Sequence, residues 1–331
     1  MNKRPVLSIC IPTYNRGEML KQSIKYMIPV CQANNIQIFV SDNASPDNTE
    51  EIMKALSNSY DFIHYHRHST NIGPDDNFEF VLKIATTKYR WLMSDTCYVD
   101  DTVDLIQDLE AADWDGYILN DPESPNSRAR FLPEKKTIYK ESISVMREVG
   151  WHLTWISCMI YNERLVNSLN FERYKDSSFN QTALMFETTA NRPCKICFNP
   201  KVAVKNLPLK KDSGWHYHVF DIMYRKWSLL IMSLPLYYPY EVKRKCLIEA
   251  SERPVMLALR YHTQRRMEGK WTWKDVYRNR FFLRQSEAPY YTLMLIGFCP
   301  KLIFLIPYSI FTNVKDALRP YWRKIKKLRN E

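Results

Sequence analysis

Short apolar runs that end in polar turns alternate with amphipathic stretches through the first part of the chain. The first run, residues 6–12, is nearly continuously apolar and is followed by Thr13-Tyr14-Asn15. A strand buried on both faces of a parallel sheet has this pattern, because helices cover both of its sides. From Gly17 onward, apolar residues recur at helical spacing. This spacing predicts a helix that packs against the first strand.

The same unit of strand, turn and helix is repeated along the first half. Further strands are expected at 37–40, 62–66, 90–93 and 116–119, and helices at 45–56, 74–85 and 101–109. In the helix of 45–56, Ser45 is expected to be the N-cap and Pro46 the first helical residue. Strands that alternate with helices of this length indicate βαβ units and a mostly parallel sheet. Ligands bind at the carboxyl edge of such sheets, where Thr13 would lie.

The second half has a weaker pattern. Helices are expected at 142–149 and 177–190, a longer strand at 154–161, and two short strands at 195–198 and 202–206. From residue 215 to about residue 270 the spacing of apolar residues is mostly helical. The sequence therefore predicts two parts, an α/β domain of residues 1–214 and a helical extension of residues 215–331.

The C-terminal tail combines an apolar stretch with a basic end. Residues 290–311 are mostly apolar but contain Pro300, Lys301 and Pro307. A membrane-spanning helix needs about 20 apolar residues, so an interfacial helix is favoured over a spanning one. A core helix with a solvated basic end is the other alternative. The basic residues that follow are Arg319, Arg323, Lys324, Lys326, Lys327 and Arg329. Apolar burial and a polybasic patch together predict a cytoplasmic protein, peripheral on the inner face of the cytoplasmic membrane.

Composition narrows the classes of partner. The chain has 331 residues, 45% hydrophobic residues and a net charge of +11, which suits an anionic membrane, a phosphorylated substrate or nucleic acid. No zinc-finger spacing and no RNA-recognition motif occur, so nucleic acid is not expected. Seven glycines form no phosphate loop, which argues against a nucleotidyltransferase. The eight cysteines are scattered and no export signal opens the chain, as in a reducing compartment. The isolated pair Cys194 and Cys197 favours strand cysteines over a zinc site.

Several motifs carry a resemblance to a known family. Ser8-Ile-Cys-Ile-Pro-Thr-Tyr-Asn-Arg16, followed by residues 40–49, resembles the start of a family 2 glycosyltransferase with the GT-A fold. Asn71-Ile-Gly73 with Asn77, and then residues 89–95, continue the resemblance over residues 5–105. The most similar members are bacterial transferases that build O-antigen or capsule, including abequosyltransferase-like ones.

The resemblance implies a fold and an activity. The fold would be the Rossmann-like GT-A domain of nucleotide-diphospho-sugar transferases, with the C-terminal helical extension added to it. The activity would be transfer of a hexosyl or deoxyhexosyl group from a nucleotide-sugar donor to a growing, lipid-linked surface polysaccharide, with inversion. Such a protein would be a peripheral membrane enzyme of lipopolysaccharide or capsule biosynthesis.

The resemblance also implies which residues bind the donor. The nucleotide-sugar pocket would be lined by Pro12, Thr13, Tyr14, Asn15, Asp42, Asn43, Asn71, Gly73, Asn77, Ser94 and Asp95. In the family, the residue matching Asp42 contacts the nucleotide base. The residues themselves leave two alternatives open. Asp42 and Asn43 would also suit an Asx-turn, and Gly73 a turn with an unusual dihedral angle.

The acidic motif of the family is reduced in this chain. Its carboxylates hold Mg²⁺ or Mn²⁺ against the donor diphosphate, but Ser94-Asp95-Thr96-Cys97 contains one carboxylate. We therefore expect Mg²⁺ or Mn²⁺ to bind weakly at Asp95 and only with the donor, and a metal requirement stays open. Basic loop residues that could stabilise the leaving group instead are Arg128, Arg130, Lys210 and Lys211.

Inverting transfer also needs a base and an acceptor pocket. The family places an acidic residue before a helix in its second half, and Asp176 is the matching residue, with an N-cap role as the alternative. Trp215, His216 and His218 could line the acceptor pocket, with core packing as the alternative. The reduced acidic motif leaves a second class open, a non-catalytic nucleotide-sugar-binding or scaffold protein.

Overall fold

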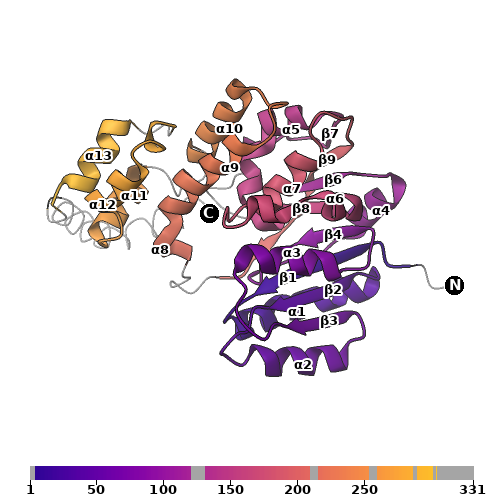
Figure 1. Cartoon of the computed structure of the whole chain (residues 1–331). Coiled ribbons are helices and arrows are strands. Elements are labelled where there is room, and N and C mark those ends of the chain that lie inside the picture. The colour runs from indigo at the N-terminus through magenta and orange to yellow at the C-terminus, as the bar shows by residue number, and fades with distance from the viewer. Residues whose placement is uncertain are drawn as a thin grey trace, which may run out of the picture.

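The computed structural model describes residues 4–120, 131–208, 215–252, 259–285, 289–300 and 303. Its centre is an eight-stranded sheet in the order β3-β2-β1-β4-β8-β6-β9-β7 (Figure 1). The strands are β1 Leu7–Thr13, β2 Gln37–Asp42, β3 Ile63–Arg67, β4 Tyr89–Leu92, β6 Gly116–Asn120, β7 Thr137–Tyr139, β8 Met159–Asn162 and β9 Ile196–Ala203. A second, two-stranded sheet pairs β5, Cys97–Tyr98, with β10, Lys205–Asn206.

Four neighbouring strands at one side of the sheet, β3, β2, β1 and β4, are all parallel. The other half is mixed, because β8 is antiparallel to both β4 and β6, and β7 is antiparallel to β9. The mostly parallel α/β sheet expected from the sequence is therefore confirmed. Its helices in the α/β part are α1 Gly17–Ala33, α2 Thr49–Ser59, α3 Pro74–Ile84, α4 Val103–Ala111, α5 Ser142–Val149, α6 Glu163–Ser168 and α7 Asn180–Thr188.

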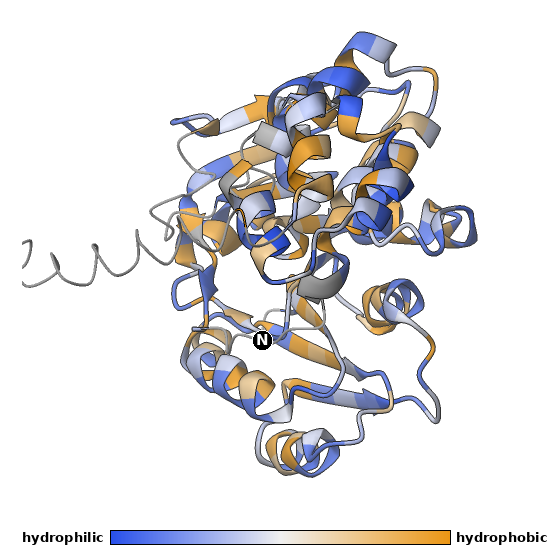
Figure 2. Ribbon diagram, turned by 90° about the vertical axis from the view of Figure 1, so that its left-hand side faces the viewer, coloured by the Kyte–Doolittle hydropathy of each residue, from blue (hydrophilic) through white to orange (hydrophobic). Residues whose placement is uncertain are grey.

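Two apolar clusters cover the two faces of the sheet. In β1, Ile9 and Ile11 face a cluster that includes Leu20 of α1 and Leu105 of α4. Residue Cys10 of the same strand faces the opposite cluster, to which α3, α5, α6 and α7 contribute. Figure 2 shows hydrophobic stretches along strands of the sheet and on parts of the helices beside them. Burial on both faces explains why the first apolar run lacks a polar alternation.

The start of α2 differs from the prediction. The helix begins at Thr49 with Asn48 as N-cap, and not at Pro46. Ser45 does not cap it, because its hydroxyl accepts from the Asn15 N–H at 2.8 Å and its own N–H donates to Asp42 Oδ1 at 2.9 Å. The polar groups of Ser45 therefore stabilise the edge of the sheet instead of the helix.

The predicted strand at 154–161 is wrong for most of its length. The ranges Gly150–Thr154 (η2) and Ile156–Cys158 (η3) are 3-10 turns, and only the last part forms β8. The two short strands predicted at 195–198 and 202–206 are instead one strand, β9, followed by the short β10. In each case the apolar pattern marked buried chain but did not identify its backbone conformation.

The predicted helix at 177–190 starts three residues late. Asp176 and Ser178 have φ angles of 63° and 62°, which lie in the left-handed region and cannot belong to a right-handed helix. A 3-10 turn, Phe171–Tyr174 (η4), precedes them, and α7 begins at Asn180.

The C-terminal part is helical, as expected. It contains α8 Trp215–Phe220, the π-helical turn η5 Asp221–Lys226, α9 Trp227–Ser233, α10 Tyr240–Glu252, α11 Leu259–Met267, α12 Trp273–Asn279, the 3-10 turn η7 Leu283–Gln285 and α13 Tyr290–Phe298. In Figure 1, α8 to α10 lie between the sheet and the helices α11 to α13. No helix among the described residues has both the length and the apolar character needed to cross a membrane. The basic residues of the tail, 319–329, all lie outside the described residues, so the expected membrane contact stays a prediction.

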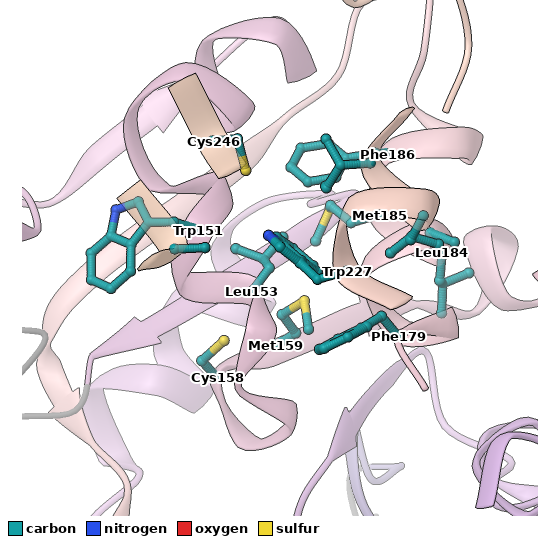
Figure 3. Packing of buried hydrophobic residues seen from close by; sticks show 14 of the residues in the cluster. Trp151, Leu153, Cys158, Met159, Phe179, Leu184, Met185, Phe186, Trp227 and Cys246 are labelled. Atoms are coloured by element: carbon teal, nitrogen blue, oxygen red, sulfur yellow. The ribbon is translucent and has the colours of Figure 1, made fainter. Parts of the chain in front are cut away.

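One apolar cluster contains residues from both sides of position 214. Trp227 of α9 packs edge-on against Phe179, with ring centroids 4.9 Å apart, and Met185 of α7 belongs to the same cluster. Figure 3 shows Trp227 among Leu153, Met159 and Phe179. The first helices after residue 214 thus complete the core of the α/β part, and the division at residue 214 stays a prediction.

Replacing Trp227 with Ala should lower the free energy of unfolding by about 3–5 kcal/mol, because a buried indole leaves a large cavity. Urea denaturation followed by circular dichroism measures the change. Trp273→Ala is the matched control, since Trp273 is 52% exposed, and its effect should stay within about 0.5 kcal/mol. Equal stability of the two variants would contradict the packing of α9 on the α/β core.

Candidate functional site

The carboxyl ends of β1, β2 and β3 meet at one edge of the sheet. Thr13 at the end of β1 pairs with Asp42 at the end of β2, and Asp42 pairs with Arg67 at the end of β3. The N–H of Asn43 donates to the carbonyl of Thr13 at 3.0 Å and extends the ladder by one residue. The structure therefore gathers at this edge the polar residues that follow each strand, as the sequence predicted.

Asp95, which follows β4, is held by two side chains of the first strand and its turn. The Thr13 hydroxyl donates to Asp95 Oδ2, and Arg16 Nη1 donates to Oδ1, both at 3.0 Å. Asp95 is 5% exposed. Burial raises the pKa of its carboxyl group, while Arg16 and Thr13 act in the opposite direction. Sequence reasoning missed Arg16, although it ends the same motif as Thr13.

The surroundings of Asp95 do not form a ready-made metal site. Both of its carboxylate oxygens already accept hydrogen bonds. The Thr96 hydroxyl lies 3.0 Å from the Ser94 hydroxyl, and the Cys97 thiol donates to Asn206 Oδ1 at 3.1 Å. Within the described residues, no group of three or more His, Cys, Asp or Glu side chains could hold a metal ion. The residues present therefore do not fit a metal site in the protein alone.

Asn43 fixes the loop between β3 and α3. Its Oδ1 accepts from the Ile72 N–H at 2.8 Å, and its Nδ2 donates to the Gly73 carbonyl at 3.1 Å. Asn71 closes the same loop by accepting from the Gly73 N–H at 2.9 Å. Gly73 has a φ of 90°, and a Cβ there would meet nothing within 4 Å. Its backbone angle, and not lack of space, therefore requires glycine.

The remaining predicted pocket residues divide into buried and exposed ones. Asn77 is buried, accepts from the Ser41 hydroxyl at 2.6 Å and donates to the Ser41 carbonyl at 3.1 Å. Pro12 lies within β1 and is also buried. Tyr14, Asn15 and Asn71 are exposed. Asn77 is thus tied to the end of β2, whereas the exposed residues are accessible to a ligand.

Asp42 is fully buried and its carboxylate is engaged. Oδ1 accepts from the Ser45 N–H at 2.9 Å, and Oδ2 accepts from the Tyr65 hydroxyl at 2.8 Å. The Arg67 guanidinium lies 3.6 Å from Oδ2. Burial and the hydrogen bond to Asp42 raise the pKa of Tyr65. Asp42 thus holds the turn after β2 through an N–H three residues on, while Asn43 bonds to the distant loop at Ile72 and Gly73, so neither forms the expected Asx-turn. A contact between Asp42 and a nucleotide base stays a proposal.

Asp176 is exposed and lies in a turn that contacts α3. The Ser178 N–H donates to Asp75 Oδ2 at 3.0 Å, and Asn180 Nδ2 donates to the Asp75 carbonyl at 2.8 Å. Lys226 Nζ donates to the Ser178 hydroxyl at 2.9 Å. The N-cap of α7 is Phe179, so the N-cap alternative for Asp176 is wrong. Its role as a base stays a proposal.

The predicted acceptor residues are placed only in part. Trp215 and His216 begin α8, but their side chains lie outside the described residues, and His218 is exposed. The basic loop residues considered for the leaving group also lie outside the described residues: Arg128, Arg130, Lys210 and Lys211.

Comparisons with known proteins agree with the sequence motifs. Residues 8–169 match the profile of the family described as Glycosyl transferase family 2. The chain is 28% identical over 218 residues to the abequosyltransferase RfbV of Salmonella typhimurium. That match covers 60% of this chain and 66%, just under two thirds, of the relative. The resemblance to the family is therefore confirmed.

Solved structures share the fold. The structure of residues 1–349 of S. aureus TarS in complex with UDP-GlcNAc aligns with a TM-score of 0.58 at 13% identity, over 85% of this chain and 81% of that one. The mannosyltransferase PcManGT from Pyrobaculum calidifontis, in complex with GDP-Man and Mn²⁺, aligns with a TM-score of 0.54 at 12% identity, over 93% and 87%. These likenesses confirm the expected GT-A glycosyltransferase fold.

Replacing Asp42 with Asn should lower the free energy of unfolding by about 1–3 kcal/mol, because the amide N–H₂ would face a donor and leave a buried hydrogen bond unmade. Urea denaturation measures the loss, with the exposed Asp61→Asn as the matched control. If the two variants are equally stable, the carboxylate of Asp42 does not hold the turn between β2 and α2.

Proposed function

Residues 8–169 match the model of glycosyl transferase family 2, and on this match we propose that the protein transfers a sugar from a nucleotide-sugar donor to a growing surface polysaccharide. The acceptor would be a lipid-linked O-antigen or capsule glycan, and the sugar a hexose or deoxyhexose. The abequosyltransferase RfbV among its relatives supports an O-antigen sugar. UDP-GlcNAc and GDP-Man, bound by the structural neighbours, are the first donors to test.

The observation that carries this proposal is the network at the carboxyl edge. Thr13, Asn43 and Asp95 come from the ends of three strands and are joined by hydrogen bonds of 3.0 Å. Asn43 in turn holds the loop of Gly73. We infer that the nucleotide lies over this network, since open α/β sheets bind ligands at this edge.

The proposed reaction is a single displacement at the anomeric carbon. The acceptor hydroxyl attacks that carbon, Asp176 takes up the hydroxyl proton, and the bond from the carbon to the donor diphosphate breaks. The nucleoside diphosphate leaves with the bonding electrons, and attack from the opposite face of the anomeric carbon inverts its configuration. Asp176 suits the role of base because its carboxylate is exposed next to α3. Arg16, about one third exposed, supplies fixed positive charge beside Asp95.

A non-catalytic nucleotide-sugar-binding or scaffold protein is the second candidate. The observation in its favour is the single acidic residue of the motif, whose oxygens are already engaged by Thr13 and Arg16. Such a protein would bind a nucleotide sugar without turnover.

The two candidates are separated by transfer and binding assays with a panel of nucleotide sugars. Asp95→Asn should lower transfer by about tenfold or more, because it removes the charge that orients Arg16, while Cys97→Ala should change it by less than about threefold. Calorimetry with the same panel measures donor affinity. Donor binding by the wild type without any transfer would favour the scaffold, and binding of no nucleotide sugar would contradict both.

For the metal, we infer that a divalent cation enters the site only together with a donor diphosphate. Mg²⁺ is typically held by one or two carboxylates, substrate phosphates and waters, and Asp95 offers one carboxylate. Calorimetry should therefore detect no binding of Mn²⁺ to the donor-free protein. Thr96→Asp should tighten binding when donor is present, because it adds a second hard ligand. Tight Mn²⁺ binding by the donor-free wild type would refute this account.

We also propose that the protein is cytoplasmic and associates peripherally with the inner face of the cytoplasmic membrane through its basic tail. Replacing Lys324, Lys326 and Lys327 with Gln should weaken binding to anionic vesicles by about 1 kcal/mol per lysine. Vesicle sedimentation at low salt measures this. A control with the same charge change replaces Lys25, Lys54 and Lys140, which are exposed elsewhere. Equal binding by both variants would show that the tail is not the anchor.

A further inference from the structure

A buried carboxylate outside the donor network joins that network to the turn of the proposed base. Asp75, in the first turn of α3, is 5% exposed. It follows Gly73 by two residues, and its Oδ2 accepts from the Ser178 N–H at 3.0 Å. The Asn180 side chain donates to its carbonyl at 2.8 Å. A short path of contacts therefore leads from Asn43 through the loop of Gly73 to Asp75 and on to the turn of Asp176.

The surroundings of Asp75 disfavour its ionised form. Burial raises the pKa of Asp75 to about 6, and Asp176 and Asp76 act in the same direction, while Ser178 and Lys226 oppose it. Among the described residues, Asp75 Oδ1 has no hydrogen-bond partner. Because the pKa is raised in the folded protein, the ionised group destabilises the fold, and that penalty is removed as the pH falls through about 6.

The turn that Asp75 holds has a strained backbone and is bonded to two different elements. Asp176 and Ser178 have left-handed φ angles of 63° and 62°, which persist only where surrounding contacts enforce them. Asp75 holds the Ser178 N–H from α3, and Lys226 holds the Ser178 hydroxyl from the end of η5 at 2.9 Å. Turns of the π-helical type such as η5 occur often at functional sites.

Two further contacts hold the turn of Asp176 and Ser178 in place. Lys175 Nζ lies 2.9 Å from Asp76 Oδ2, which ties the residue before Asp176 to the first turn of α3. Phe179 and Trp227, which follow Ser178 and Lys226 in sequence, pack edge-on against each other (Figure 3). Several contacts therefore hold the turn of Asp176 against α3 and η5, and Asp75 is the buried carboxylate among them.

We propose that Asp75 is a positioning residue that fixes the Asp176 turn against the donor loop, and that it does so in its ionised form. The ionised carboxylate strengthens the hydrogen bond from Ser178 and attracts Lys226, which grips the other side of the turn. Asp75 is too buried to touch an acceptor, whereas Asp176 is exposed. The inference rests on the proposed function, because that function assigns Asp176 as the base.

The test compares Asp75→Asn and Asp75→Ala with Glu79→Gln, a control on the same helix whose partner, Lys83, also lies on α3. The rate of amide hydrogen exchange at residues 174–180 measures how often the turn opens, and this measurement does not depend on enzyme activity. Asp75→Ala should speed this exchange by about tenfold, because the Ser178 N–H loses its acceptor. Asp75→Asn should speed it by a smaller factor, about threefold, because a neutral acceptor holds the Ser178 N–H less firmly.

Kinetics then separate positioning from donor binding. Asp75→Ala should lower kcat by about tenfold or more with the donor KM within about threefold of wild type. The wild-type kcat should fall as the pH drops through about 6, and the fold should become more stable over the same range. Asp75→Asn should have a lowered kcat that does not fall further as the pH drops through about 6. Its urea midpoint should rise less than that of the wild type over the same pH range.

The outcomes distinguish this inference from the proposed function. If the wild type binds no nucleotide sugar and transfers none, the proposed function fails, and hydrogen exchange still decides whether Asp75 holds the turn. If the wild type is active but exchange and kcat in Asp75→Ala equal those of Glu79→Gln, the inference is wrong. Loss of donor affinity with unchanged exchange would also overturn it, because Asp75 would then belong to the donor pocket. An acid limb that persists in Asp75→Asn would refute the role of its charge.

Discussion

The buried carboxylate of Asp95 is the constraint around which the edge of the sheet is arranged. A buried charge must be paired and hydrogen-bonded, and at 5% exposure Asp95 obtains its partners from Thr13 and Arg16, about eighty positions earlier in the chain. These bonds fix the end of β4 against the turn after β1. The same turn meets the end of β2 through Asn43, which holds the loop before α3. The site therefore depends on the parallel sheet that brings these strand ends together.

Much of the fold follows from apolar spacing alone. The first strand, α1, α3 and α5 lie where the pattern predicts them, because each buries a continuous run or stripe against the sheet. The failures have local causes that are not visible in hydrophobicity. Serine is a common N-cap residue, yet the Ser45 hydroxyl accepts from the Asn15 N–H and the Ser45 N–H donates to Asp42.

The polar network at the sheet edge was predictable where a family motif marks it and not elsewhere. Thr13, Asn43 and Asp95 were named from motifs, and the structure joins them. Arg16 and Asp75 were missed because their partners, Asp95 and Ser178, are distant in sequence. A hydrogen bond between distant positions leaves no periodic signal in one sequence. Only the tertiary structure shows that the first turn of α3 contacts the turn of Asp176.

The proposed function requires a nucleotide-sugar donor over the carboxyl ends of β1, β2 and β4. A crystal structure of the protein with a nucleoside diphosphate would locate the donor. We expect the base and ribose between Thr13 and the loop of Gly73, with the diphosphate on the side of Asp95 and Arg16. A nucleotide bound away from this edge, or at it without contact to either Asn43 or the loop of Gly73, would show that the donor site lies elsewhere.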